Sequence, residues 1–167
     1  LEVGADKDAQ DLDGSTAVHY AALNGYEAVV EVLLAAGCSV DLPTNDGMTP
    51  LMGAARSNHA GTVKLLLEAG AEKDARDMIG TTALSIATDK GHVETVGLLL
   101  AAGCDKELAS DNGRTPLMRA AANGQVECVR LFIESGACKT AMDQDGATAL
   151  RLAVEGGHHD VAALLRQ

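Results

Sequence analysis

A repeat of 33 residues runs through the whole sequence, and it constrains the fold more than any other feature. Glycine, threonine and alanine each recur at this spacing in five successive units. The matching positions are Gly14, Gly47, Gly80, Gly113 and Gly146, then Thr16, Thr49, Thr82, Thr115 and Thr148, and finally Ala21, Ala54, Ala87, Ala120 and Ala153. A fixed period of this length is typical of a solenoid, in which similar units stack along one axis.

Each unit contains the signals for two short helices joined by a tight loop. Thr49 is a favourable N-cap, and Pro50 suits the first helical position, where its missing amide hydrogen has no partner to lose. The first helix is expected to end near Asn58, where four other units have glycine. The second helix carries Leu66 inward and stops at Gly70. An extended arm then leads to the turn of the next unit.

Two short helices cannot bury both of their apolar faces alone, so adjacent units must stack. The sequence therefore predicts an all-α solenoid of helix-loop-helix repeats with protruding β-hairpin loops, forming a single array over residues 1–167. Residues 1–10 match the end of a preceding repeat. Because neither end has an obvious polar cap, we expect additional repeats or a partner to cover at least one end. Full repeats are expected at residues 11–43, 44–76, 77–109, 110–142 and 143–167.

Residues 47–55 (GMTPLMGAA) and 113–121 (GRTPLMRAA) share one motif, and residues 65–71 (LLLEAGA) contain a second. The first motif resembles the first helix of the ankyrin repeat family, and the second resembles the end of that family's second helix. The usual histidine of the first motif is kept only as His19. The resemblance covers the entire chain, and it implies that a protein partner binds the hairpin tips and the exposed surface of the first helices.

Charge and composition argue against several classes of partner. The chain has 24 acidic and 13 basic side chains, and the resulting net charge of −11 repels phosphate backbones. Nucleic acid is therefore not an expected partner. No apolar stretch approaches the roughly 18 residues of a membrane span, so membrane insertion is not expected. Residues 11–43 contain no Lys or Arg. This acidic unit either attracts a basic partner or serves solubility as a solvated face.

The repeat also accounts for the four cysteines. Cys38 and Cys104 occupy the same position two units apart, which is too far for a disulfide. Cys128 falls on the inward face of its helix, and Cys138 lies in an extended arm. We therefore expect four free thiols, which favours an intracellular and cytoplasmic location.

No catalytic, metal or cofactor site is predicted. His158 and His159 are adjacent and point apart on a helix, and no third ligand lies at a suitable spacing. The glycines recur as turns and helix ends rather than as a phosphate-binding motif. Acidic and hydroxyl side chains are spread along the stack instead of converging in one pocket. The chain is therefore not expected to be an enzyme.

Positions that differ from repeat to repeat indicate the partner-binding surface, because the structural positions are held constant. Met78 and Ile79 stand out, since three of the other four tips have two polar residues in their place. The contrast is with Asn45-Asp46, Asp111-Asn112 and Gln144-Asp145. Met78 and Ile79 suit the apolar centre of a hot spot, unless both side chains fold down against neighbouring tips. The predicted partner-binding residues are Leu12, Asp13, Ser15, Asn45, Asp46, Met48, Arg56, Arg76, Met78, Ile79, Thr81, Lys90, Asp111, Asn112, Arg114 and Asn123.

The function that best fits these features is a protein-interaction module. Two other classes stay open. One is a structural subunit fixed within a large assembly, which binding surfaces at the ends of the stack would indicate. The other is the regulatory segment of a larger enzyme, which would require catalytic sequence outside these residues.

Overall fold

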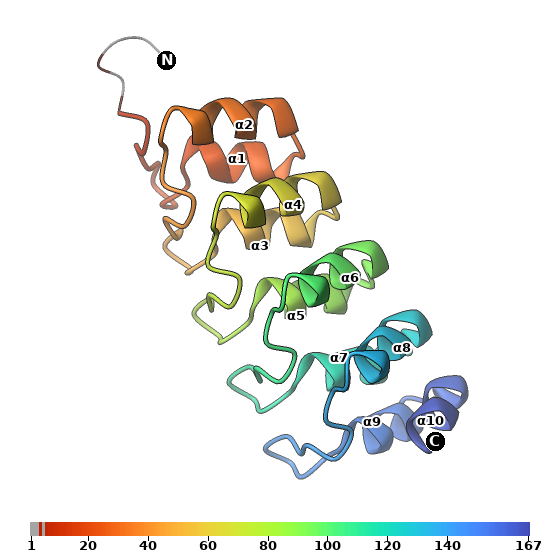
Figure 1. Ribbon diagram of the computed structural model, residues 1–167. Coiled ribbons are helices and arrows are strands. Elements are labelled where there is room, and N and C mark those ends of the chain that lie inside the picture. Colours follow the sequence, from red (N-terminus) through yellow and green to blue (C-terminus); the bar gives the residue numbers. More distant parts are fainter. Residues whose placement is uncertain (1–3, 5) are drawn as a thin grey trace.

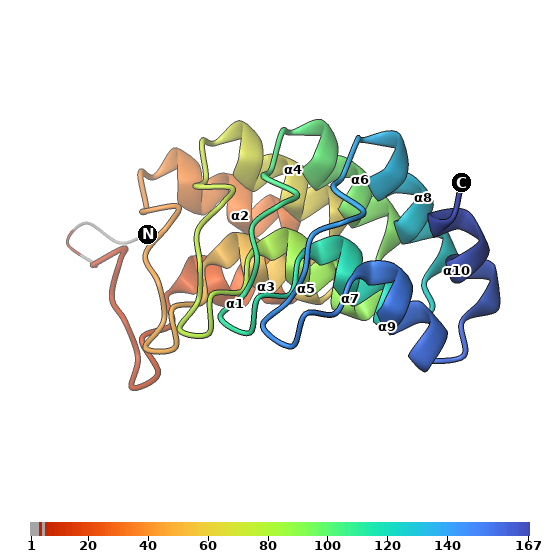
Figure 2. The ribbon, with the colours of Figure 1, turned by 90° about the horizontal axis from the view of Figure 1, so that it is seen from below.

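The computed structural model describes residue 4 and residues 6–167, and these residues form ten α-helices in five pairs (Figure 1). The pairs stack along one axis, so the first helices form one layer and the second helices another (Figure 2). The predicted all-α solenoid is confirmed. The first helices are α1 (Ala17–Leu23), α3 (Pro50–Arg56), α5 (Ala83–Lys90), α7 (Pro116–Ala122) and α9 (Ala149–Glu155). The second helices are α2 (Glu27–Ala35), α4 (Ala60–Glu68), α6 (Val93–Ala101), α8 (Val126–Glu134) and α10 (His159–Leu165).

The helices begin and end where the sequence predicts. Thr49 Oγ1 accepts the N–H of Met52 at 3.4 Å, and Pro50 is the first residue of α3. Thr115 caps α7 with the same kind of bond. Asn58 follows α3 with a φ of 61°, a left-handed conformation that asparagine tolerates better than most residues. The local signals are therefore sufficient to define each helix pair.

The core lies between the two helix layers and between successive pairs. Small residues occupy the buried positions of the first helices, which allows these helices to approach closely. Larger apolar residues fill the matching positions of the second helices. The buried residues of the two layers are Ala21, Ala54, Ala87, Ala120 and Ala153, and Leu33, Leu66, Leu99, Phe132 and Leu165.

The protruding loops differ in one respect from the prediction. We call residues 11–15, 44–48, 77–81, 110–114 and 143–147 tips one to five. In tip three the N–H of Asp77 donates to the carbonyl of Thr81 at 3.0 Å, which closes the turn. The described residues contain no β-strand, so the expectation of β-hairpins is wrong. Each tip is closed within five residues, which leaves no arms long enough to pair as strands.

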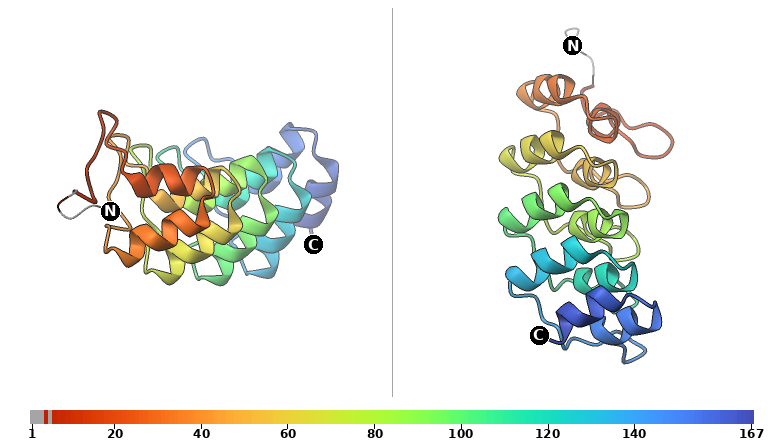
Figure 3. Two further views of the ribbon diagram at one scale, coloured as in Figure 1. Left: turned by 90° about the horizontal axis from the view of Figure 1, so that it is seen from above. Right: turned by 90° about the vertical axis from the view of Figure 1, so that its right-hand side faces the viewer.

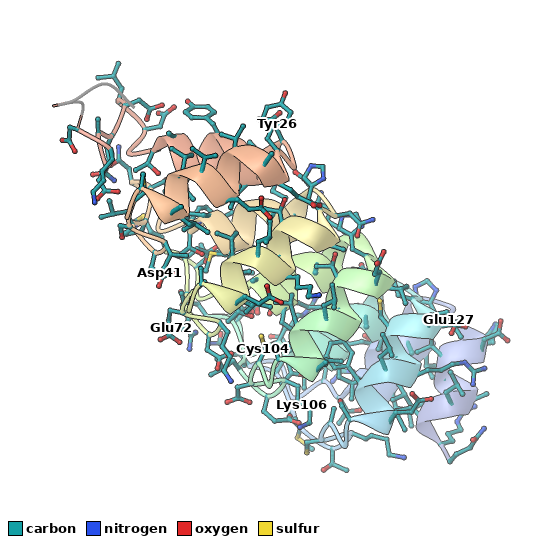
Figure 4. All side chains as sticks on the ribbon, turned by 45° about the horizontal axis from the view of Figure 1, so that its top comes forward. Tyr26, Asp41, Glu72, Cys104, Lys106 and Glu127 are labelled. Atoms are coloured by element: carbon teal, nitrogen blue, oxygen red, sulfur yellow. The ribbon has the colours of Figure 1, made fainter. Side chains whose placement is uncertain are left out.

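One backbone hydrogen bond joins each tip to the next, and the tips protrude together on one side of the stack (Figure 3). The arms are joined as well, because the Asp41 carboxylate accepts the N–H of Glu72 at 3.0 Å (Figure 4). The tips therefore form a row whose backbone is fixed. The joining bonds run from Asn45 N to Asp13 O (2.9 Å), Met78 N to Asp46 O (3.0 Å), Asp111 N to Ile79 O (3.1 Å) and Gln144 N to Asn112 O (3.3 Å).

The prediction of free thiols is confirmed for all four cysteines. Cys38, Cys104 and Cys128 are buried, whereas Cys138 is exposed. Burial raises the pKa of the Cys104 thiol to about 12. A hydrogen bond from the Thr140 hydroxyl lowers the pKa of the Cys138 thiol below its ordinary value. Three of the cysteines therefore serve as packing residues.

Candidate groove between the tips and the first helices

Most of the sixteen residues predicted to contact a partner are accessible. Ser15, Met48 and Arg114 are half-buried. Thr81 is only 4% exposed, so placing it on the open tip surface is wrong. Both of its backbone groups bond to Asp77, and the turn closes over its side chain. The exposed residues are Leu12, Asp13, Asn45, Asp46, Arg56, Arg76, Met78, Ile79, Lys90, Asp111, Asn112 and Asn123.

Two hollows lie between the tips and the first helices. The N-terminal hollow has a volume of about 380 Å³ and spans repeats one and two. The central hollow has a volume of about 320 Å³ and spans repeats two to four. Met48 and Arg56 line both hollows, so the two are halves of one groove. Seven further predicted residues line the same groove, namely Asp13, Ser15, Asn45, Asp46, Ile79, Thr81 and Lys90.

The two halves of the groove differ in charge. Asp13 and Asp46 face Arg56 in the N-terminal hollow. The central hollow has three basic side chains, Arg56, Lys90 and Arg119, and two acidic ones, Asp77 and Asp89. The N-terminal hollow therefore has a net charge of −1 and the central hollow a net charge of +1, which a partner with the opposite arrangement would match.

Met78 and Ile79 are exposed by 73% and 64%, so the alternative that they fold down against neighbouring tips is wrong. The N–H of Met78 and the carbonyl of Ile79 both bond to adjacent tips. Because the backbone faces the neighbouring tips, the side chains extend away from the row. Ile79 lines the central hollow, and the pair forms an apolar rim beside it.

A family model described as "Ankyrin repeats (3 copies)" matches residues 1–77 and 84–167. The chain belongs to the ankyrin repeat family. No curated protein matches the sequence. Ankyrin repeats are in general protein-interaction modules, and in this ankyrin array the groove runs along the tips and first helices.

Four lining residues of the central hollow are absent from the sixteen predicted partner contacts. Ile86 and Arg119 project from the first helices, Asp89 precedes the predicted Lys90, and Asp77 begins tip three. Arg119 forms an ion pair with Asp89, which ties repeat four to repeat three. The sequence contained a signal for Ile86 and Arg119, because their shared position has a different residue in every unit of the ankyrin array. These residues are Tyr20, Gly53, Ile86, Arg119 and Leu152.

The histidines of the ankyrin array have structural roles. His92 Nε2 donates to the carbonyl of Arg56 at 3.1 Å, and His158 Nε2 donates to the carbonyl of Ala122 at 2.9 Å. Each of these bonds ties a second helix to the first helix of the preceding repeat. Within residues 6–167 and residue 4, no group of three or more His, Cys, Asp and Glu side chains is placed to hold a metal. No described helix is long and apolar enough to span a membrane.

His19, as a neutral imidazole, joins two parts of the wall of the N-terminal hollow. Its Nδ1 accepts the N–H of Thr16 at 3.0 Å, and its Nε2 donates to the carbonyl of Met48 at 3.0 Å. Burial is the main cause that lowers the pKa of His19 below its ordinary 6.5. The unfolded chain therefore takes up this proton more readily than the folded chain. The contribution of His19 to stability is complete above pH 6.5 and is lost as pH falls from 6.5 toward the folded-state pKa.

We therefore expect the free energy of unfolding to fall as the pH drops below 6.5, and the fall to be smaller in a His19→Met variant. Methionine occupies this position as Met52 and Met118 in two other repeats, so the substitution suits the fold. Urea denaturation followed by circular dichroism measures the difference. Identical pH dependence in both proteins would show that His19 is not the titrating group.

Proposed function

We propose that this ankyrin array binds a protein partner along the groove, with Met78 and Ile79 at the centre of the contact. The observation that carries the proposal is the exposure of these two apolar side chains, 73% and 64%, on a backbone fixed by hydrogen bonds. Two adjacent apolar residues are unusual on a tip surrounded by water. A partner that covers them removes this surface from water.

The surroundings of the pair fit the anatomy of a hot spot. Interface hot spots place an apolar centre within a polar rim, and arginine is enriched among them. Arg76 donates to the carbonyl of Ala109 at 2.9 Å and to Asp111, so it is held beside tip three. Because the tip backbone is already ordered, binding there costs less conformational entropy than ordering a free loop would.

The combined substitution Met78→Asp and Ile79→Asp tests the proposal. We expect the affinity for a partner recovered by affinity capture to fall by on the order of 2 kcal/mol, which is about thirtyfold. Isothermal titration calorimetry measures this change. The melting temperature should barely move, because both side chains are exposed.

Met142→Asp is the matched control, because Met142 is 67% exposed but lies in an arm away from the groove. It should leave both affinity and stability unchanged. Unchanged affinity in the double variant contradicts the proposal, whereas early unfolding of that variant would show that the pair stabilises the tip row.

A second candidate, a structural element of a larger assembly, is favoured by the outer face of the first repeat. Tyr20, Tyr26, Val29 and Val32 are 47–63% exposed there (Figure 4 labels Tyr26). The positions equivalent to Val29 are buried in every later repeat, where the preceding helix pair covers them. We infer that a helix pair, from an additional repeat or from a partner, packs on this face. The equivalent buried residues are Thr62, Thr95, Cys128 and Val161.

Hydrogen exchange in the captured complex distinguishes this candidate from binding in the groove alone. Coverage of the outer face should slow the exchange of amides in α1 and α2. A partner confined to the groove should slow exchange only at the tips and first helices of repeats one to four. Unchanged exchange in α2 would therefore exclude the structural candidate.

The free thiols also support the proposal that the chain works inside the cell, in the cytoplasm. Disulfides form and persist in oxidising compartments and are rare in the cytosol. The four cysteines of this array are all unpaired. Cell fractionation with an antibody against the chain tests the location, and recovery from a secreted fraction would contradict it.

A further inference from the structure

The central hollow combines cations with apolar side chains. Arg56 and Lys90, which we call the rim cations, are exposed at its edge. Neither forms an ion pair with any residue that the structure describes. Ile79 and Ile86 supply apolar lining, and Met48 joins the hollow to the rest of the groove.

The carboxylates of the same hollow are already engaged. Asp89 is paired with Arg119 across two repeats. Asp77 Oδ1 accepts the N–H groups of Ile79 and Thr81 at 3.0 and 2.7 Å, so it serves the closure of tip three. The three cations and two carboxylates of the hollow leave a net charge of +1, and neither rim cation has a carboxylate partner.

Two buried donors in the hollow also lack an acceptor. Thr81 is 4% exposed, and its hydroxyl has no hydrogen-bond partner among the described residues. The Nε of Arg119 has none either. A buried donor without an acceptor is destabilising. Both atoms are enclosed by the protein, so a ligand at the rim cations reaches them only if the surrounding side chains move.

We propose that the central hollow receives a partner segment in which an aspartate or glutamate stands next to a large apolar side chain. The carboxylate lies over the rim cations, and the apolar side chain packs against Ile79 and Ile86. The volume of about 320 Å³ suits a few side chains of one segment rather than a whole folded surface. This inference rests on the proposed function, because it names the chemistry that the groove selects.

The net charge of −11 does not prevent an acidic segment from binding. Charges more than about 8 Å apart are largely screened at physiological salt. Successive helices pack about 8–10 Å apart, so the acidic first repeat lies more than one screening length from Lys90 in the third repeat. Lys90 is therefore screened from the first repeat, whereas Arg56 also borders Asp13 and Asp46 in the N-terminal hollow. A ligand in the central hollow meets the positive balance of its own lining.

Selection from a random library of 12-residue peptides displayed on phage, with the whole 167-residue chain as bait, tests the inference. We expect the enriched peptides to carry Asp or Glu within two residues of Leu, Ile, Met, Phe or Trp. Fluorescence anisotropy then gives the affinity of each synthetic peptide. Arg56→Glu combined with Lys90→Glu should weaken binding at least tenfold, as should alanine in place of the peptide's acidic residue.

Lys64→Glu combined with Arg130→Glu is the control, because it makes the same change in net charge on the second helices and should alter affinity less than twofold. The inference would be overturned if basic peptides were enriched or if no peptide were enriched. It would also be overturned if the affinity of acidic peptides stayed the same when the charges of the rim cations were reversed. Basic peptides that are lost on Ile79→Asp would leave the proposed function standing. If neither Ile79→Asp nor the reversed rim cations changed the affinity of the peptides, both the proposed function and this inference would be overturned.

Discussion

Phe132→Ala will lower the free energy of unfolding by about 3–5 kcal/mol. The side chain is fully buried in α8, and it occupies the position that leucine fills in the other repeats. Removing the ring loses apolar burial and leaves a cavity, which the stacked helices on either side cannot close without moving. Because α8 contacts both α6 and α10, the cavity weakens the interfaces of repeat four with repeats three and five.

Urea denaturation followed by circular dichroism measures this loss as a lower midpoint. Val154→Ala is the control, because Val154 is 49% exposed in the next repeat and its truncation should change stability by less than about 0.5 kcal/mol. Equal effects of the two substitutions would contradict the stacked arrangement of the core.

Gly47→Ala will lower the free energy of unfolding by about 2–5 kcal/mol and will also disturb the tip that we propose binds a partner. Gly47 has a φ of 80°, where a side chain costs about 1–2 kcal/mol. A Cβ there would lie 3.0 Å from Asp77 Cα and 3.1 Å from Met78 N. The next tip must then move, at a further cost of about 1–3 kcal/mol. The movement strains the hydrogen bond from Met78 to Asp46 and displaces the exposed apolar pair.

Gly70→Ala separates the cost of a side chain at positive φ from the cost of the close contact with the next tip. Gly70 has a φ of 86°, and nothing lies within 4 Å of the added Cβ, so only the conformational cost of about 1–2 kcal/mol applies. Urea denaturation should show a larger loss for Gly47→Ala, and only that variant should weaken partner binding. Equal losses and equal affinities would show that the tips are not closely packed.

The sequence was sufficient to predict the elements whose signals are local. Thr49 with Pro50 favours the start of a helix whatever the tertiary structure around it. Asn58 tolerates the positive φ that follows the end of the helix. Met78 and Ile79 were recognised as candidates because two apolar residues break a polar pattern. These features depend on chemistry within a few residues of the chain.

Features that depend on how the repeats pack could not be predicted from local sequence signals. Arg119 reaches the groove because α7 stacks beside α5, where it meets Asp89. Thr81 varies like a contact residue, yet the turn that Asp77 closes buries it. The tips lack strands because each tip is closed within five residues, as the bond from Asp77 N to Thr81 O closes tip three. The variation between repeats therefore identified the face of the array that has the groove, but not which of its residues are buried.

Site-specific photo-cross-linking tests the central claim, that the groove is the partner-binding surface, most directly. A photoreactive residue replaces Ile79 or Lys90 in the groove, and Lys64 or Arg130 on the exposed surface of the second helices. We predict that a captured partner cross-links at the two groove positions and at neither second-helix position. Cross-links at Lys64 or Arg130, with none at Ile79 and Lys90, would contradict the account.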